Sequence, residues 1–334
     1  MTIKDLSAQT GYSVGTISRV LNNQPNVSEK ARRAILAAAA ESGFQLNANA
    51  KQLKQQHSNS ILVVVKGTSN QFFGGLVESI QHRLAETPHP LVVDYIDEDD
   101  NEVRRALQLC REKKPLGVLF LGANRQNLEA DFSKIGVPCV VVTNSAADLG
   151  YPNLNSVASD DRQATREAIG ALAERGHRKF VIIGGERRVS GTAGQRYRGC
   201  LEAFQANGIE FDQELDYEAV RFSYDGGYHA AERLLERGRK FTALFAMADV
   251  MAIGAIRALT DHGLRVPEDV SVMGYDGLKI GDYTVPKLST VRQCVDALAE
   301  ESIRILLENI PHLRPPRHET VPVTVELKES IRRI

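Results

Sequence analysis

The residues of this 334-residue chain that are best suited to contact a partner lie near its beginning. Ser13 can cap a helix, because its hydroxyl can accept a hydrogen bond from a backbone N–H of the first turn. In that helix Ile17, Val20 and Leu21 share one face at helical spacing. The other face carries small, polar or cationic residues: Val14, Gly15, Ser18, Arg19 and Asn22. Short hydrogen-bonding side chains beside an arginine suit a polar, anionic surface.

Two further helices are expected around this one. A helix from about Ile3 to Gln9 precedes it, and Gly11 suits the turn between them. This arrangement fits the helix-turn-helix, which places its second helix in the DNA major groove, although a two-helix corner with a solvated face has the same pattern. Ser28 can cap a third helix that stops near Gly43. Its expected apolar stripe consists of Ala31, Ile35, Leu36 and Ala39.

Length and charge indicate a chain of several domains with a basic N-terminal part. The length suits two or three domains. Residues 1–57 hold seven Lys and Arg against three acids, so the rest, with 34 basic and 39 acidic residues, is acidic. The basic charge therefore coincides with the candidate DNA-contacting helix.

Cysteines and hydropathy exclude several classes of protein. Cys110, Cys139, Cys200 and Cys294 are far apart in sequence without metal-ligand spacing, so neither a disulfide framework nor a metal site is indicated. The N-terminus lacks a signal-sequence pattern, and the longest strongly apolar run, Ile61 to Val65, is too short to cross a bilayer. We expect a cytoplasmic protein without a membrane segment. Neither GxGxxG nor GxxxxGK[ST] occurs, so a nucleotide-dependent enzyme has little support and no cofactor is expected.

From Ser60 onward the chain alternates between apolar runs and amphipathic segments, which predicts an α/β fold with parallel sheets covered on both faces. Ten or eleven strands favour two doubly wound lobes. We expect a helical head at 1–46, a linker at 47–58, and a two-lobed unit at 59–334, with one lobe at about 59–158 plus 293–325 and the other at 159–288. The runs taken as strands are ILVVVK, LVVDYI, LGVLFLG, PCVVVTN, NSVAS, FVIIGG, a segment near Glu218, TALFAM, VSVMGYD, STVRQ and VPVTVEL.

A ligand site is expected where these strands end, because open α/β sheets bind ligands at the carboxyl ends of their strands. Aromatic faces suit the apolar faces of a sugar ring, and carboxylate and guanidinium groups suit its hydroxyls. Phe72 and Phe73 could instead be core, Asp276 could cap a turn, and Arg196 could bridge surface acids. The residues after the runs are Asn70 to Phe73, Thr143, Ser159, Asp160, Thr192 to Arg196, Phe222, Ala248, Asp249, Asp276 and Gln293.

Taken together, the chain resembles the lactose/galactose repressor (LacI/GalR) family of bacterial transcription regulators. The resemblance implies a DNA-binding head, a hinge helix and an effector domain similar to periplasmic sugar-binding proteins, working as a homodimer on a palindromic operator. The absence of a trailing apolar heptad favours a dimer over a tetramer. The motifs that carry the resemblance are GYSVGTISRVLN, VSEKARRAIL, GFQLNANAKQL, SNQFFGGLVESI, ERGHRKFVIIGG, DVMAIGAIRALTDHGLRVPEDVSVMGYD and PKLSTVRQ.

For the head, the resemblance implies that Val14 and Gly15 choose operator bases and that Arg19 reaches a base edge, with guanine as the expected base. An Arg–guanine contact of this kind contributes about 1–3 kcal/mol of discrimination. Gly15 could instead only permit close approach of the helix. Four polar residues of this region are interpreted as phosphate contacts: Ser13, Thr16, Ser18 and Asn22.

In the linker, the resemblance implies that Leu53 of each subunit wedges between base pairs in the minor groove. Asn47, Ala50 and Lys51 are assigned to the DNA side of the same segment. Leu53 could instead rest on the effector domain. Leu46 and Lys51 depart from the proline and arginine more usual in this family, so the ordering of the hinge is expected to be less sharply preset.

For the effector domain, the resemblance singles out Phe72, Phe73, Arg196, Phe222 and Asp276, and we add Thr192 and Gln293 to the predicted site. Ala248 replaces a polar residue common in the family, which predicts one missing ligand hydrogen bond. The expected function is a non-enzymatic repressor of a carbohydrate-utilisation operon, controlled by a small sugar. Two alternatives stay open: a regulator with a nucleoside or purine corepressor, and a cytoplasmic sugar-binding protein without a DNA function.

Overall fold

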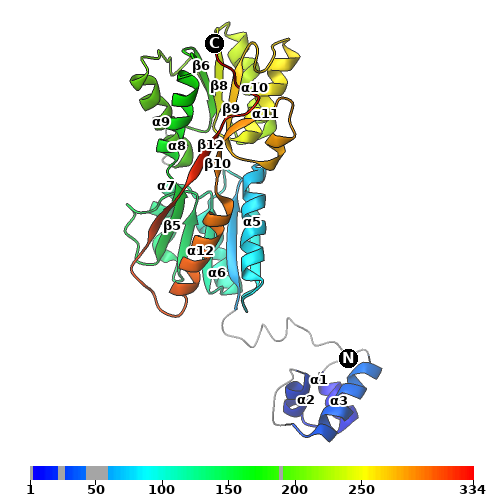
Figure 1. The fold of residues 1–334 in the computed structure, drawn as a ribbon. Helices are drawn as coiled ribbons and strands as arrows, with labels where there is room; N and C mark the ends of the chain where they lie inside the picture. The colour runs from blue at the N-terminus through cyan, green and yellow to red at the C-terminus, as the bar shows by residue number, and fades with distance from the viewer. Residues whose placement is uncertain (1–2, 22–26, 43–58, 188–190) are drawn as a thin grey trace. The chain divides into compact units, whose positions relative to one another are not determined.

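The computed structural model describes residues 3–21, 27–42, 59–187 and 191–334. The chain forms two compact units, residues 1–58 and residues 59–334 (Figure 1). Each is described by itself. No helix in the described ranges is long and apolar enough to span a membrane.

The described residues of the first unit form the short helices α1 (Ile3–Thr10), α2 (Val14–Leu21) and α3 (Glu29–Glu41). The expected caps are present, because the Ser13 hydroxyl accepts from the Thr16 N–H at 3.2 Å and the Ser28 hydroxyl accepts from the Ala31 N–H at 3.3 Å. Gly11 has a φ of +72°, a backbone conformation that favours glycine in the turn between α1 and α2. The buried core of the unit consists of Leu6, Ile17, Val20, Ala31, Ile35 and Ala39.

The prediction that Leu36 belongs to the apolar stripe of α3 is wrong. Leu36 is 47% exposed, whereas Ala38 is buried. The core-facing positions advance by four and then three or four residues from Ala31, in step with the helical period of 3.6 residues. Leu36 is displaced from Ile35 by about 100° around the helix and therefore leaves the core.

The second unit has two lobes, and the expected α/β architecture is confirmed. The first lobe contains a six-stranded parallel sheet in the order β11-β5-β4-β3-β1-β2. Helices α5 (Gln71–Leu84), α6 (Glu102–Lys113), α7 (Arg125–Asp131) and α12 (Val295–Asn309) belong to this lobe, with a 3-10 turn at Phe132–Lys134. Its strands are β1 (Ile61–Lys66), β2 (Leu91–Ile96), β3 (Gly117–Leu121), β4 (Cys139–Val142), β5 (Leu154–Ser159) and β11 (His318–Val321).

The second lobe repeats this plan with the order β12-β10-β9-β8-β6-β7, in which only β12 runs antiparallel to its neighbour. Its helices are α8 (Asp161–Ala173), α9 (Thr192–Ala206), α10 (Tyr224–Glu236) and α11 (Asp249–Asp261), with a 3-10 turn at Lys279–Asp282. Its strands are β6 (Phe180–Gly184), β7 (Tyr217–Ala219), β8 (Ala243–Ala246), β9 (Ser271–Asp276), β10 (Ser289–Gln293) and β12 (Val323–Glu326).

The C-terminal part differs from the expected lobe boundaries. The strand expected at VPVTVEL is present as β12, but it joins the second sheet, and a strand that was not predicted, β11, precedes it and joins the first sheet. Pro322 lies between them, and proline has no N–H to donate to a sheet ladder, so it separates the two strands. β10 and β12 belong to the second lobe, which therefore includes residues outside the expected range of 159–288.

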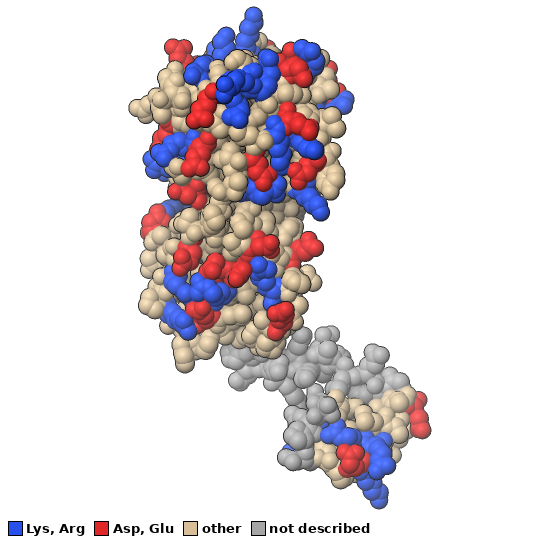
Figure 2. All heavy atoms as spheres, viewed as in Figure 1, with Lys and Arg blue, Asp and Glu red and all other residues tan. Residues whose placement is uncertain are grey.

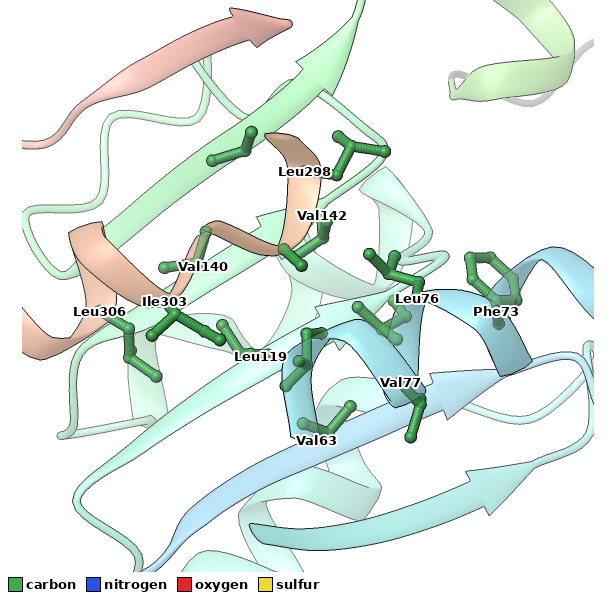
Figure 3. Packing of buried hydrophobic residues seen from close by; sticks show 14 of the residues in the cluster. Val63, Phe73, Leu76, Val77, Leu119, Val140, Val142, Leu298, Ile303 and Leu306 are labelled. Carbon is green, nitrogen blue, oxygen red and sulfur yellow. The ribbon is translucent and has the colours of Figure 1, made fainter. Parts of the chain in front are cut away.

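In the first lobe, α5 and α12 pack against each other and against the strands of the sheet. Figure 3 shows Leu76 of α5 and Leu298 and Leu306 of α12 directed towards Val63, Leu119 and Val140 of the strands. Full burial of each such side chain contributes about 1.5–3 kcal/mol. This packing holds the carboxyl ends of the strands, where the ligand site is expected, in fixed positions.

Candidate functional site

The outward face of α2 is solvent-exposed, as its composition predicts. Val14 is 40% exposed, Gly15 and Arg19 are exposed, and Ser18 is half-buried. The hydroxyls of Ser13 and Thr16 lie 2.9 Å apart and hydrogen-bond to each other.

Gly15 is not required by the packing of the head. A Cβ atom at this position would meet only the Ser13 hydroxyl, at 3.8 Å, which is an ordinary contact. Of the predicted DNA-contacting residues, Asn22, Asn47, Ala50, Lys51 and Leu53 lie outside the described residues.

A cavity of about 340 Å³ lies between the two lobes. Its wall is built from the carboxyl ends of strands and the first turns of the following helices. All seven residues predicted for effector binding line it: Phe72, Phe73, Thr192, Arg196, Phe222, Asp276 and Gln293. They come from segments more than 200 residues apart in sequence, so the fold brings the predicted set together.

Arg196 is buried rather than part of a surface bridge, with 3% of its surface exposed. Its Nε donates to Asp161 Oδ1 at 2.9 Å, and its Nη1 donates to the Met247 carbonyl. The guanidinium also stacks 3.5 Å from the centre of the Tyr275 ring. These contacts hold the side chain in one orientation, which is the preorganisation that a binding site needs.

Asp276 is the most unusual group of the cavity. Its Oδ1 accepts from Gln293 Nε2 at 2.8 Å, whereas its buried Oδ2 has no hydrogen-bond partner among the described residues. Burial raises the pKa of Asp276 to about 8, although Arg196 opposes this shift with Nη1 at 3.7 Å from Oδ1. Its φ of 114° is strained for a non-glycine residue, as is that of Thr143 (82°), which also lines the cavity.

The aromatic residues serve both the core and the cavity. Phe72 and Phe73 are buried in the apolar core of the first lobe at the start of α5, where the Asn70 side chain accepts from the Phe72 N–H at 3.0 Å. The rings lie close to backbone, because a Cβ at Gly122 would come within 2.9 Å of Phe73 and one at Gly185 within 2.8 Å of Phe222. Glycine at 122 and 185 is therefore needed to make room for the rings.

Some of the residues that follow strands do not line this cavity. Ala248 and Asp249 are buried and do not line the cavity. Asp249 instead forms hydrogen bonds inside the second lobe, where its carboxylate accepts from the Thr290 hydroxyl at 2.7 Å and from the Leu278 N–H at 2.6 Å. The missing ligand hydrogen bond expected at Ala248 therefore does not concern this cavity. Ser159 and Asp160 line a neighbouring cavity of about 430 Å³.

Several polar residues of the cavity were not predicted: Lys66, Glu98, Asp99, Asn124, Asn144 and Glu186. All lie at or just beyond the ends of strands, so the rule about carboxyl ends could have found them. Asn144 and Thr192 join the two lobes directly, because the Thr192 hydroxyl donates to Asn144 Oδ1. Within the described ranges, no cluster of His, Cys, Asp and Glu could hold a metal ion.

Surface charge on the two-lobed unit is mixed. Figure 2 shows basic and acidic residues interspersed over its visible face, without a large field of one sign.

Comparisons with known proteins cover both units. A family model described as "Bacterial regulatory proteins, lacI family" matches residues 2–47, and one for a periplasmic binding protein-like domain matches residues 169–331. The transcriptional regulator MalR of Clostridium butyricum is 33% identical over 93% of both chains. The repressor PurR of Haemophilus influenzae (strain PittEE) is 31% identical over 100% of this chain and 99% of its own.

Solved structures agree with these matches along the whole chain. A lac repressor dimer bound to operator and the anti-inducer ONPF has a TM-score of 0.81 at 25% identity, and a complex of the regulator CelR with cellobiose has a TM-score of 0.72 at 28% identity. Each comparison covers 99% of both chains. The chain therefore belongs to the LacI family and is a DNA-binding transcriptional regulator, not an enzyme.

Proposed function

We propose that this regulator is a homodimeric repressor of a carbohydrate-utilisation operon, and that a neutral sugar bound in the interlobe cavity changes its affinity for a palindromic operator. The observation that carries the proposal is the cavity itself, in which aromatic rings and the buried Asp276–Arg196–Gln293 group line one space. Asp276 Oδ2 has no partner among the described residues, so it is available to hydrogen-bond a ligand. A sugar hydroxyl can either donate to this carboxyl or accept from its protonated form.

The size and lining of the cavity favour a small polyhydroxylated ligand. Its volume of about 340 Å³ lies at the lower end of the range for small-molecule sites. Phe73 and Phe222 offer ring faces for the C–H side of a sugar, and Asn124 and Asn144 offer amide groups for its hydroxyls. The cellobiose complex of a relative supports a sugar as the ligand class.

Thermodynamic linkage explains how ligand binding would control DNA binding. A ligand that contacts both lobes binds one interlobe arrangement more tightly, and this difference in affinity is the free energy with which it shifts the operator-binding equilibrium.

On the DNA side, we propose that Arg19 reads a guanine and that Val14 and Gly15 face the neighbouring bases. Phosphate contacts are proposed for Ser13, Thr16, Ser18 and Asn22. Leu53, flanked by Asn47, Ala50 and Lys51, is assigned to the minor groove.

Two measurements on the full-length protein test the proposal. A selection of genomic fragments should return a palindromic site, and a thermal-shift panel of monosaccharides, disaccharides, purine bases and nucleosides should find stabilisation by a sugar. The same sugar should change operator affinity in a fluorescence-anisotropy titration. Stabilisation by a purine base, with no response to any sugar, would contradict the sugar assignment and favour a purine corepressor.

A further inference from the structure

One arginine of the second lobe contacts three consecutive acids of the first lobe. Arg221, in the segment between β7 and α10, donates from Nη1 and Nη2 to Asp97 Oδ2 and Oδ1 at 3.1 and 3.0 Å. Its Nε lies 3.2 Å from Glu98 Oε1, and Nη2 also contacts Asp99. The acids follow β2 in the first lobe. The contacts therefore join the two lobes through residues that are more than 120 positions apart in the chain.

The contact lies at the edge of the ligand cavity. Glu98 and Asp99 line the cavity from the first lobe, and Val220 and Phe222, the two neighbours of Arg221, line it from the second. Burial raises the pKa of the Glu98 carboxyl, and the nearby charge of Arg221 opposes this shift. Glu98 therefore belongs both to the cavity wall and to the contact between the lobes.

The acidic segment does not depend on Arg221 for its shape. Asp97 Oδ1 accepts from the Asp99 N–H at 3.0 Å, and Asp100 Oδ2 accepts from the Asp97 N–H at 3.2 Å. Lys66 at the end of β1 donates to the Asp100 carbonyl at 2.6 Å. Because these contacts lie within the first lobe, loss of Arg221 leaves the segment folded but leaves its three carboxylates without the cation that joins them to the second lobe.

We propose that Arg221 and the Asp97–Glu98–Asp99 segment form a latch across the mouth of the ligand cavity, and that Glu98 is a positioning residue that links this latch to the bound ligand. The latch favours the closed arrangement of the lobes, so a ligand enters when it opens and is retained when it closes. The Arg221 side chain is 54% exposed, so the contact is partly screened and its strength falls with salt. The link to the ligand rests on the proposed small-molecule function, whereas the latch itself does not.

The latch is tested first without any ligand, by hydrogen–deuterium exchange of the full-length protein. Arg221→Ala should raise amide exchange at residues 97–99 and 220–223 by about 3- to 10-fold, an effect in the range of an exposed ion-pair network. In the wild-type protein, 0.5 M KCl should act in the same direction. The matched control is Arg257→Ala, which removes an arginine of the same lobe whose ion pair, with Asp261, lies within α11. Unchanged exchange in Arg221→Ala would overturn the latch.

The link to the ligand is tested with whichever sugar gives the largest thermal shift in the panel above. Arg221→Ala should release this sugar about 3- to 10-fold faster in stopped-flow experiments, and Glu98→Gln, which keeps the size of the side chain, should weaken its binding. Arg257→Ala should match the wild type. Faster amide exchange in Arg221→Ala with unchanged sugar kinetics would overturn the link. If no sugar binds the wild type, the proposed function fails, and the exchange experiment still decides the latch.

Discussion

The outward face of α2 and the interlobe cavity differ in the exposure of their polar residues. On α2 the candidate contact residues are exposed, and the core of the head lies on the other side of the helix. In the cavity, Arg196, Asp276 and Gln293 are buried and hydrogen-bonded to one another or to the second lobe. We therefore expect that the residues proposed to contact DNA can change with little effect on the fold, whereas those proposed to contact the ligand also stabilise it.

The cores beneath the two regions differ as well. Among the described residues, the head has one small cluster of buried apolar residues, in which Leu6, Ile17 and Ile35 are the largest. The described part of the two-lobed unit has four larger clusters, each made of strand and helix residues. Because a small domain buries a smaller fraction of its surface, the head is expected to be the more easily unfolded unit. The following substitutions test this contrast.

The largest effect is expected for Arg196→Ala. It leaves Asp161 and Asp276 buried without their cation, which costs about 3–5 kcal/mol of unfolding free energy. Ligand-induced stabilisation should be lost as well. Chemical denaturation of the full-length protein measures the first effect, and the thermal-shift panel measures the second. Arg162→Ala, which removes an arginine paired with Glu202 at the surface, is the control and should cost under about 1 kcal/mol. A small loss of unfolding free energy in Arg196→Ala would contradict the view that the buried cavity residues also stabilise the fold.

In the head, Ile17→Ala should cost about 2–5 kcal/mol, because it opens a cavity in the small core. A unit of this size has little stability in reserve, so operator affinity should be lost while the ligand-induced thermal shift remains. Gel shifts and the thermal-shift panel measure these two responses. Val14→Ala, on the exposed face of the same helix, should leave the head folded.

Arg19→Ala should weaken operator binding by about 1–3 kcal/mol, or roughly 10- to 100-fold, because it removes one bidentate base contact. The unfolding curve should not change, since the side chain is exposed. Anisotropy titrations with operator and with unrelated DNA separate base recognition from general attraction to phosphate. An equal loss for both DNAs would assign Arg19 to a phosphate instead.

Asp276→Asn tests the charge of the cavity through its dependence on pH. Burial raises the pKa of Asp276 from 3.8 to about 8, so between these values the folded protein binds the proton more tightly than the unfolded chain. This carboxyl therefore contributes stability at low pH that is lost as the pH rises through about 8. Asparagine removes the charge and keeps an oxygen for Gln293, so the variant should be more stable than the wild type at pH 8, by several kcal/mol. Thermal unfolding between pH 5 and 9 should show the difference shrinking towards pH 5.

The smallest effect is expected for Gly15→Ala. The new Cβ has room, and alanine is the better helix former, so the head should gain about 0.5–1 kcal/mol. Thermal unfolding of the head measures this gain, and an operator selection measures any change in base preference. A changed preference with an unchanged fold would show that Gly15 is chosen for the DNA; a loss of stability would show that the head needs the glycine.

Local patterns in the sequence predicted the helices of the head, their serine caps and the alternation of strands and helices, because these depend on neighbours a few residues away. The predicted cavity residues follow from one general property of parallel sheets, that the carboxyl ends of their strands share one edge.

Only the tertiary structure decided the features that depend on distant partners. The division of the last segment at Pro322 places β11 and β12 in different sheets, and Asp249 lies beneath the cavity because Thr290 and Leu278 bind it there. Arg221 and Glu98 are single charged residues in loops, and no local period marks them as partners. Their contact exists because two lobes, each folded by its own local pattern, meet at one cavity.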